Sequence, residues 1–375
     1  MSSRSLVSVV LLVVLSLLAL RSIAKLLDNP TAFPPHDFVE YWCAGALNLA
    51  GRDPYDPAAM YALEQEIGWD IGQAVMMWNP PWTLTVAMPL AELPWRTAQI
   101  VWFAVRIAAF CLSAHLLATT YRRPRAAWAI TFTWLPCYIA LQYGQIPPLM
   151  LLGVALFVYL EQRGHRFAAG FACVLLAVKP HLAILFWLAV GLHAIRNREW
   201  RIVAGGLVGG LVFSVWPLVQ NPQVFTQYFA SARTNPPTQW MSPTLGTLLR
   251  AIFGVEQFWL QFLPMLPGLV WLAWHWAKTR RTWNWTEQTP GLILVSFVTA
   301  PYGAWPYDLT LLVLPFVAVA AARGPTVPLV VFYALLNAGM LVCVGLGLPA
   351  HWAVWVAPVA LGGGLYLTTR RNETA

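Results

Sequence analysis

Apolar runs recur along almost the whole chain, and short turns that carry arginine separate them. A helix of about 20 apolar residues crosses the hydrocarbon core of a bilayer, so these runs predict membrane spans. We expect about twelve, at residues 6–27, 97–120, 126–141, 147–160, 167–178, 182–194, 202–219, 258–277, 292–301, 309–322, 327–346 and 352–367. The runs 167–178, 182–194 and 292–301 are short for a full crossing. The pattern predicts an all-α polytopic membrane protein, and we interpret residues 1–375 as a single transmembrane domain.

Two longer polar stretches interrupt this pattern, a first outer loop at residues 28–96 and a second at residues 220–256. Within the first, residues 37–50 mix apolar and polar positions as in a helix that lies on the membrane surface. Residues 57–67 predict a second short helix. The run that begins at Asn79-Pro80-Pro81 has about 13 residues, too few to span a bilayer, and is interpreted as re-entrant or interfacial.

Composition and charge support the membrane assignment and fix an orientation. Charged residues make up only 10% of the chain, against about 25% in soluble proteins. The net charge of +8 does not indicate nucleic acid, because 15 of the 23 lysines and arginines lie at one set of run ends. Positive residues mark the cytoplasmic side, so both termini are predicted to be cytoplasmic. The five cysteines show no disulfide framework and no zinc-like spacing.

Acidic residues are scarce, and every aspartate except Asp308 lies between Asp28 and Asp70. Asp37 and Glu40 are three residues apart, so on a helix their carboxylates share one face. Two acids just beyond a span could simply solvate a loop. The aromatic Asp-Phe-x-x-Tyr-Trp context favours function instead: a carboxylate held there could remove a proton from an acceptor hydroxyl. We therefore predict Asp37 as a general base.

Isolated cations within apolar stretches are the next candidates. Lys179 is one of only three lysines, and an ionisable residue at membrane depth indicates function. It could bind the phosphate of a lipid carrier, or it could be a lysine that reaches to the interface. Arg106, inside the run 97–120, allows the same two interpretations. His181 is too isolated to predict a metal ligand, and we include it among the substrate contacts.

Two polar and aromatic clusters lie at predicted outer turns. Residues 142–145 end in Gln145, and residues 302–308 run from Tyr302 to Asp308. Amides could bind a sugar or could satisfy a helix end. Aromatic faces stack on sugar rings, although they also form interfacial belts. No Walker loop, dinucleotide-binding glycine motif or metal cluster is found, so we predict neither cofactor nor metal.

The ordered motifs resemble glycosyltransferase family 87, a family of polytopic GT-C enzymes that includes the polyprenyl-phosphate-mannose-dependent mannosyltransferases of bacteria. The resemblance runs from about residue 30 to 325. Two departures stand out: Ile146-Pro147 follows Gly-Gln where the family often has Asn after one intervening residue, and Tyr302 stands where a His is common. The motifs that carry the resemblance are Asp37-Phe38-x-x-Tyr41, Gly51-x-Asp53-Pro54-Tyr55, Asn79-Pro80-Pro81, Gly144-Gln145, Lys179-Pro180 and Tyr307-Asp308-Leu309.

The resemblance implies a GT-C fold and an acidic base in the first outer loop, which corresponds to Asp37. It also implies a polyprenyl-phosphate-sugar donor, a lipid or glycan acceptor, and chemistry on the outer face of a bacterial cell membrane. We predict a hexosyltransferase with mannose as the expected sugar. Lys179 and Arg106 would neutralise the leaving phosphate, and Glu40 and Asp308 would position hydroxyls. The other predicted substrate contacts are Tyr41, Asn79, Gln145, His181 and Tyr302.

Two other functions remain open from the sequence. A flippase or transporter of lipid-linked sugar would show internal repeats and charged or broken helices near mid-membrane; no clear repeat is seen, and the acids gather in a loop. A glycan polymerase or ligase that uses the same carrier would have a dominant late loop, and residues 220–256 are only moderately long.

Overall fold

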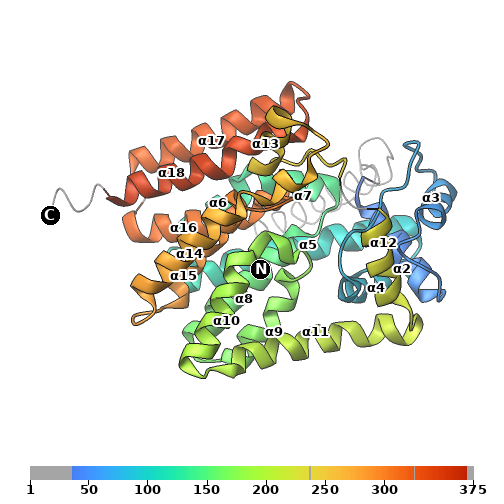
Figure 1. The fold of residues 1–375 in the computed structure, drawn as a ribbon, viewed down its shortest axis with the longest axis horizontal. Helices are drawn as coiled ribbons and strands as arrows, with labels where there is room; N and C mark the ends of the chain where they lie inside the picture. Colours follow the sequence, from blue (N-terminus) through green and yellow to red (C-terminus); the bar gives the residue numbers. More distant parts are fainter. Residues whose placement is uncertain (1–35, 236–237, 325, 370–375) are drawn as a thin grey trace, which may run out of the picture.

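The computed structural model describes residues 36–235, 238–324 and 326–369, and these residues form helices connected by turns, with no strands (Figure 1). The predicted span at 6–27 lies outside the described residues. The first outer loop and the run after it contain α2 (Phe38–Leu49), α3 (Pro57–Glu66), η1 (Pro81–Thr83) and α4 (Leu84–Ala91). The remaining helices of the first half are α5 (Trp95–Tyr121), α6 (Pro124–Thr133), α7 (Leu135–Tyr143), α8 (Pro147–Gln162), α9 (Arg166–Leu176), η2 (Pro180–Ala183) and α10 (Ile184–Asn197).

The second half follows the same pattern of apolar helices and turns. It contains α11 (Trp200–Gln220), α12 (Val224–Thr234), α13 (Leu245–Phe253), η3 (Phe258–Phe262), α14 (Met265–Thr279), α15 (Trp285–Val298), η4 (Asp308–Leu312), α16 (Val313–Arg323), α17 (Val327–Gly345), η5 (Ala350–Trp355) and α18 (Val356–Thr369). In Figure 1, α17 and α18 lie side by side at one end of the molecule, and α2, α3 and α4 lie at the other.

Three described helices are long and apolar enough to cross a membrane: α5, α11 and α17. They coincide with the predicted runs 97–120, 202–219 and 327–346. The other apolar helices are shorter, among them α8 and α9. The chain is therefore a helical membrane protein, and the count of twelve spans stays a prediction.

Several predicted spans are interrupted in the structure. The run 126–141 is not one helix but two, α6 and α7, with Trp134 extended between them at ψ 114°. Pro136 explains the break, because proline lacks the N–H of a helical hydrogen bond and its ring clashes with the preceding turn. Side chains satisfy the opened backbone: Asn337 accepts from the Leu135 N–H at 2.8 Å. The run 258–277 likewise divides into η3 and α14 around Pro264.

The helix predicted to lie on the surface, α2, is instead mostly buried within the protein. It packs on α4, α3 and the end of α11. Gly45 lies so close to the backbone of Ala87 that an added Cβ would be 2.9 Å from its carbonyl carbon. Asn48 donates to the Pro217 carbonyl at 3.2 Å. The small residues on α2 permit this close packing, which a polar–apolar pattern alone does not reveal.

Close helix packing also joins α9 to α11. A Cβ added to Gly170 would overlap the Ile202 carbonyl oxygen, and one added to Gly205 would overlap the Phe167 carbonyl oxygen. Glycine at both positions lets the two backbones touch, a common way for membrane helices to associate. This contact holds α9, and with it the turn that follows α9, against the long helix α11.

We predict that Gly205→Ala destabilises the protein by about 1–3 kcal/mol, because its methyl group would force α9 and α11 apart. Gly210→Ala is the matched control, since it lies on the same helix and no atom lies within 4 Å of its added Cβ. Thermal unfolding of both variants in detergent tests this. A Gly205→Ala protein as stable as Gly210→Ala would contradict the packing argument.

Candidate active site

A cavity of about 530 Å³ opens between the first outer loop, the second long loop (residues 220–256) and three connections between helices. The connections are α7–α8, α9–α10 and the segment between α15 and α16. The cavity brings together most of the candidate residues predicted from the sequence. Those that line it are Asp37, Glu40, Asn79, Gln145, Lys179, His181, Tyr302 and Asp308.

The Gly144-Gln145 motif joins α2 to the α7–α8 connection. Gly144 has φ +75° and ends α7, and an added Cβ would lie 2.7 Å from that of Phe38. Only glycine combines this left-handed backbone with such a close approach. The Asp37 N–H donates to the Tyr143 carbonyl at 3.0 Å, and Trp102 Nε1 donates to the Gly144 carbonyl at 2.6 Å. These contacts fix the start of α2, and therefore the two acids, beside Gln145.

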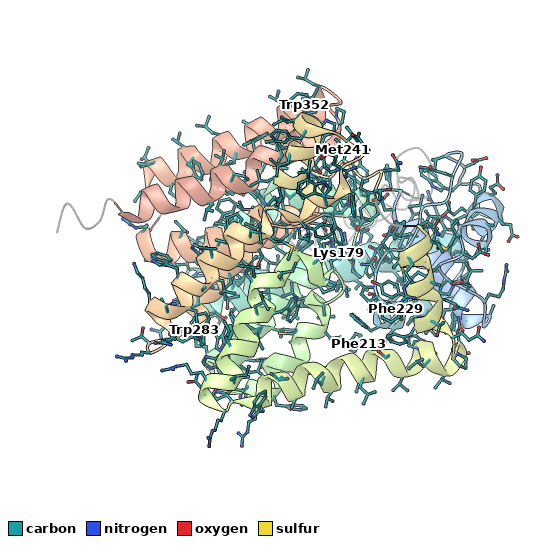
Figure 2. All side chains as sticks on the ribbon, in the orientation of Figure 1. Lys179, Phe213, Phe229, Met241, Trp283 and Trp352 are labelled. Carbon is teal, nitrogen blue, oxygen red and sulfur yellow. The ribbon has the colours of Figure 1, made fainter. Side chains whose placement is uncertain are left out.

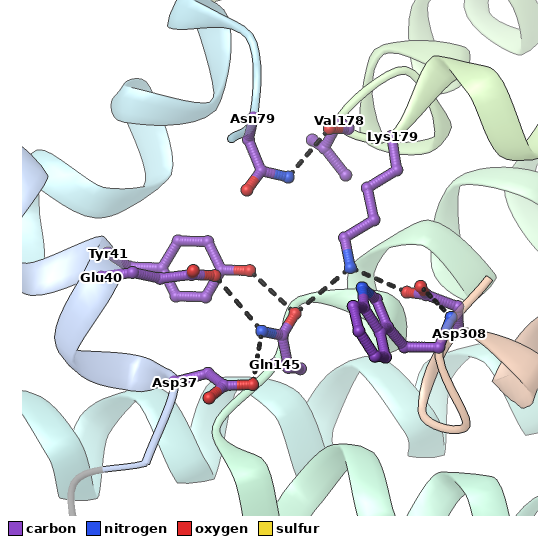
Figure 3. Close-up of polar contacts among 9 residues, drawn as sticks. Asp37, Glu40, Tyr41, Asn79, Gln145, Val178, Lys179 and Asp308 are labelled. Carbon is purple, nitrogen blue, oxygen red and sulfur yellow. Dashed lines mark hydrogen bonds and ion pairs between the residues drawn. The ribbon is translucent and has the colours of Figure 1, made fainter. Parts of the chain in front are cut away.

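Gln145 is the centre of a buried hydrogen-bond network (Figure 3). Its Nε2 donates to Asp37 Oδ2 at 3.0 Å and to Glu40 Oε1 at 3.2 Å. Its Oε1 accepts from the Tyr41 hydroxyl at 3.1 Å and from Lys179 Nζ at 3.3 Å. One amide therefore links Asp37 and Glu40, at the start of α2, to Lys179 in a distant connection.

Lys179, which is labelled in Figure 2, lies between Gln145 and Asp308. Its Nζ contacts Asp308 Oδ1 at 2.8 Å and lies 4.8 Å from the ring centre of Tyr307. The other oxygen of Asp308 accepts from the Trp305 N–H at 3.0 Å. An ammonium group has three N–H donors, and described residues accept from two of them. The third remains for a ligand in the cavity.

The Asn79-Pro80-Pro81 motif holds the backbone that carries Lys179. Asn79 Nδ2 donates to the Val178 carbonyl at 2.9 Å, and Trp82 Nε1 donates to the Ala177 carbonyl at 3.2 Å. The Tyr55 hydroxyl in turn donates to the Asn79 carbonyl at 3.1 Å. The motif therefore positions the lysine from the opposite wall of the cavity.

Burial controls the protonation of the acids. It raises the pKa of Asp37, and the hydrogen bond from Gln145 and the charge of Lys179 offset only part of that rise. Burial, together with the Asp37 charge, raises the pKa of Glu40 well above its usual value. Burial also raises the pKa of Asp308, against the nearby Lys179 charge. A raised pKa makes the Asp37 carboxylate a stronger proton acceptor than an exposed aspartate.

His181 and Tyr302 form the wall next to Lys179. Their rings stack at 4.6 Å between centres, and Gly303 at φ +72° lies so close that a Cβ would be 2.5 Å from His181 Nε2. Burial and the Lys179 charge lower the pKa of His181 to about 3, so the ring is neutral. Tyr302 provides an aromatic face at this wall.

Two predicted contacts do not line the cavity. Tyr41 lies behind Gln145 and reaches it through its hydroxyl. Arg106 is 1% exposed, and its NH1 donates to the carbonyls of Ala140 and Leu141, each at 2.8 Å. Arginine near the end of a helix satisfies such carbonyls. The structure therefore places Arg106 as a support for the end of α7, away from the cavity.

Several lining residues were missed by the sequence analysis. They are aromatic side chains whose spacing resembles that of an ordinary interfacial belt: Tyr55, Trp78, Tyr228 and Trp240. Of these, Tyr55 alone carried a signal, as part of the Gly51-to-Tyr55 motif. Trp305, which also lines the cavity, lies in the aromatic cluster 302–308 that the sequence singled out. Among the described residues no group of three or more His, Cys, Asp or Glu could hold a metal ion, and metal independence stays a prediction.

The model of glycosyltransferase family 87 matches residues 78–301, more than half of the chain. The chain belongs to glycosyltransferase family 87. No curated protein and no solved structure matches it. The family-87 segment contains Asn79, Gln145 and Lys179, whereas Asp37, Glu40 and Asp308 lie outside it. The structure alone connects these acids to the matched residues.

We predict that Arg106→Gln lowers the stability of this glycosyltransferase by about 1–3 kcal/mol, because backbone carbonyls at the end of α7 would lose their donors. The Michaelis constant for the donor should change by less than about twofold, since Arg106 does not line the cavity. Thermal unfolding and donor titration measure the two effects. Arg125→Gln, at an exposed position, is the control. If the stability of Arg106→Gln is unchanged and its Michaelis constant for the donor rises, Arg106 would instead be assigned to phosphate binding.

Proposed function

We propose that this family-87 glycosyltransferase transfers a hexose, with mannose the expected sugar, from a polyprenyl-phosphate donor to a lipid-linked or glycan acceptor. The observation that carries the proposal is the Gln145 bridge, which holds the buried Glu40 and the partly buried Asp37 and Lys179 at one cavity. Acids and a cation in one cavity suit a reaction that both removes a proton and releases a phosphate.

In the proposed reaction, Asp37 accepts the proton of an acceptor hydroxyl as its oxygen bonds to the anomeric carbon. The bond between that carbon and the phosphate oxygen breaks, and the phosphate leaves with the electron pair. Lys179 stabilises the charge that develops there, and such stabilisation is usually a large part of catalysis. Asp308 keeps the lysine in place through the 2.8 Å contact. Burial raises the pKa of Glu40 well above its usual value, and we propose that Glu40 positions a hydroxyl.

The proposed setting is the outer face of a bacterial cell membrane, in a GT-C arrangement formed by one domain. The connections that carry Gln145, Lys179 and Asp308 alternate with turns that carry Arg122, Arg163 and Arg198. Basic turns are typical of the cytoplasmic side, which supports an outer position for the cavity. Membership of a glycosyltransferase family favours this function over the transport of a lipid-linked sugar.

We predict that Asp37→Asn lowers the turnover rate by about 10²–10⁴-fold, because the amide cannot accept the proton. The assay uses purified protein in nanodiscs, synthetic polyprenyl-phosphate-mannose and membrane lipid extract as the source of acceptor. Glu92→Gln makes the same chemical change at an exposed position of the same loop and should keep the wild-type rate. Equal transfer by Asp37→Asn, with an unchanged chromatographic profile, would remove Asp37 from the mechanism.

The pH dependence of transfer gives a separate prediction. Because Asp37 must be ionised to act and burial raises its pKa, the rate should fall on the acid side with a midpoint above the usual aspartate value of about 4. Gln145→Leu removes a hydrogen bond that lowers the pKa of Asp37, so the midpoint should move to higher pH. Rate–pH profiles of both proteins test this; an acid midpoint that is the same in both would contradict the role of Gln145.

A further inference from the structure

Three tryptophans that the proposed chemistry does not use line the cavity. Trp78 precedes Asn79, Trp240 lies in the second long loop, and Trp305 lies in the turn before Asp308. The ring centres of Trp78 and Trp240 are 5.3 Å apart at 89°, and those of Trp240 and Trp305 are 6.0 Å apart at 62°. Three segments that are distant in sequence thus place three half-buried indoles edge to face.

The polar edges of these indoles have no protein partner among the described residues. Trp82, Trp102 and Trp134 each donate their Nε1–H to a backbone carbonyl. By contrast, no described residue accepts from Nε1 of Trp78, Trp240 or Trp305. An indole N–H can only donate, and leaving it unpaired against hydrocarbon costs free energy. The arrangement therefore suits a ligand with hydroxyl oxygens better than a prenyl chain.

Charged side chains bind the backbones of two of the three tryptophans: Arg250 binds that of Trp240, and Asp308 binds that of Trp305. Arg250 is 1% exposed, and it donates to the Trp240 carbonyl at 3.1 Å and to the Val255 carbonyl at 2.8 Å. Trp305 donates its N–H to Asp308 at 3.0 Å. Burying a guanidinium is costly unless it is fully hydrogen-bonded. Arg250, in α13, therefore fixes the backbone of Trp240 before any ligand binds, which reduces the entropy lost on binding.

We propose that Trp78, Trp240 and Trp305 form a platform that binds a pyranose ring. The C–H face of the ring would pack on the negative faces of the indoles, which attract partly positive hydrogens, and its hydroxyls would accept from the Nε1–H groups. Within the proposed function this ring belongs either to the acceptor glycan or to the hexose of the donor. The same stacking and hydrogen-bonding contacts would bind the ring of the acceptor glycan and the hexose of the donor.

Saturation-transfer NMR on the full chain in nanodiscs tests the platform, with the methyl α-D-pyranosides of mannose, glucose and galactose as probes. At least one glycoside should receive saturation at its ring C–H protons from wild type. Trp240→Ala should bind it roughly three- to tenfold more weakly, and Trp240→Phe should retain part of the binding because it keeps an aromatic face. Trp200→Ala is the control, since Trp200 is 54% exposed and does not line the cavity.

Added lipids then separate the two sources of the ring. If the glycoside signal survives saturating polyprenyl-phosphate-hexose, the platform binds the acceptor ring. If that donor removes the signal but bare polyprenyl phosphate does not, the platform binds the hexose of the donor. Displacement by bare polyprenyl phosphate would overturn the proposal in favour of a prenyl site. Equal binding by Trp240→Ala and wild type, or no binding by wild type, would also overturn it. Because the readout needs no turnover, it is independent of the assay on Asp37→Asn.

Discussion

One side-chain amide determines how the charges of this protein can coexist in its interior. Gln145 directs its NH₂ group at two carboxyls and its carbonyl at a phenol and an ammonium group. The amide cannot be reversed without setting its carbonyl against both carboxyls. Buried charges without partners are strongly unfavourable, so the acids and the lysine depend on this one orientation. Asp37 and Lys179 are thus connected through hydrogen bonds to the same Gln145 side chain and not through a direct ion pair.

This constraint explains why the site lies where helices are interrupted. Within a regular helix, neighbouring backbone groups are paired and side chains fill the surface, which leaves little room for a polar network. Gly144 ends α7, Pro180 lies in the break between α9 and α10, and Gly303 lies in the break between α15 and η4. Non-helical backbone at membrane depth is tolerated where it is buried in protein or lines a cavity. The interruptions that shorten the spans are therefore the same features that create the site.

The sequence predicted the segments of the site but not all of their roles. Asp37, Gln145 and Lys179 were identified because polar residues are rare in an apolar chain. The same signal selected Arg106, whose guanidinium supports the end of α7; only tertiary contacts distinguish a cation that faces a cavity from one that faces a helix end. Trp78 and Trp240 carried no signal, because in a chain with 21 tryptophans aromatic residues at a loop are expected. Burial of α2 also depends on partners that no local pattern contains.

The segment that matches the family model contains only part of the candidate site. The matched segment contains the amide and the lysine, and the acids come from outside it. Those acids are nevertheless fixed by matched residues, since the Asp37 N–H bonds to the Tyr143 carbonyl and Phe38 packs directly on Gly144. A side chain at position 144 would push α2 away from the cavity and lengthen both bonds from Gln145 to the acids. The distance between Asp37 and Lys179 therefore depends on the turn at position 144, and that turn requires glycine.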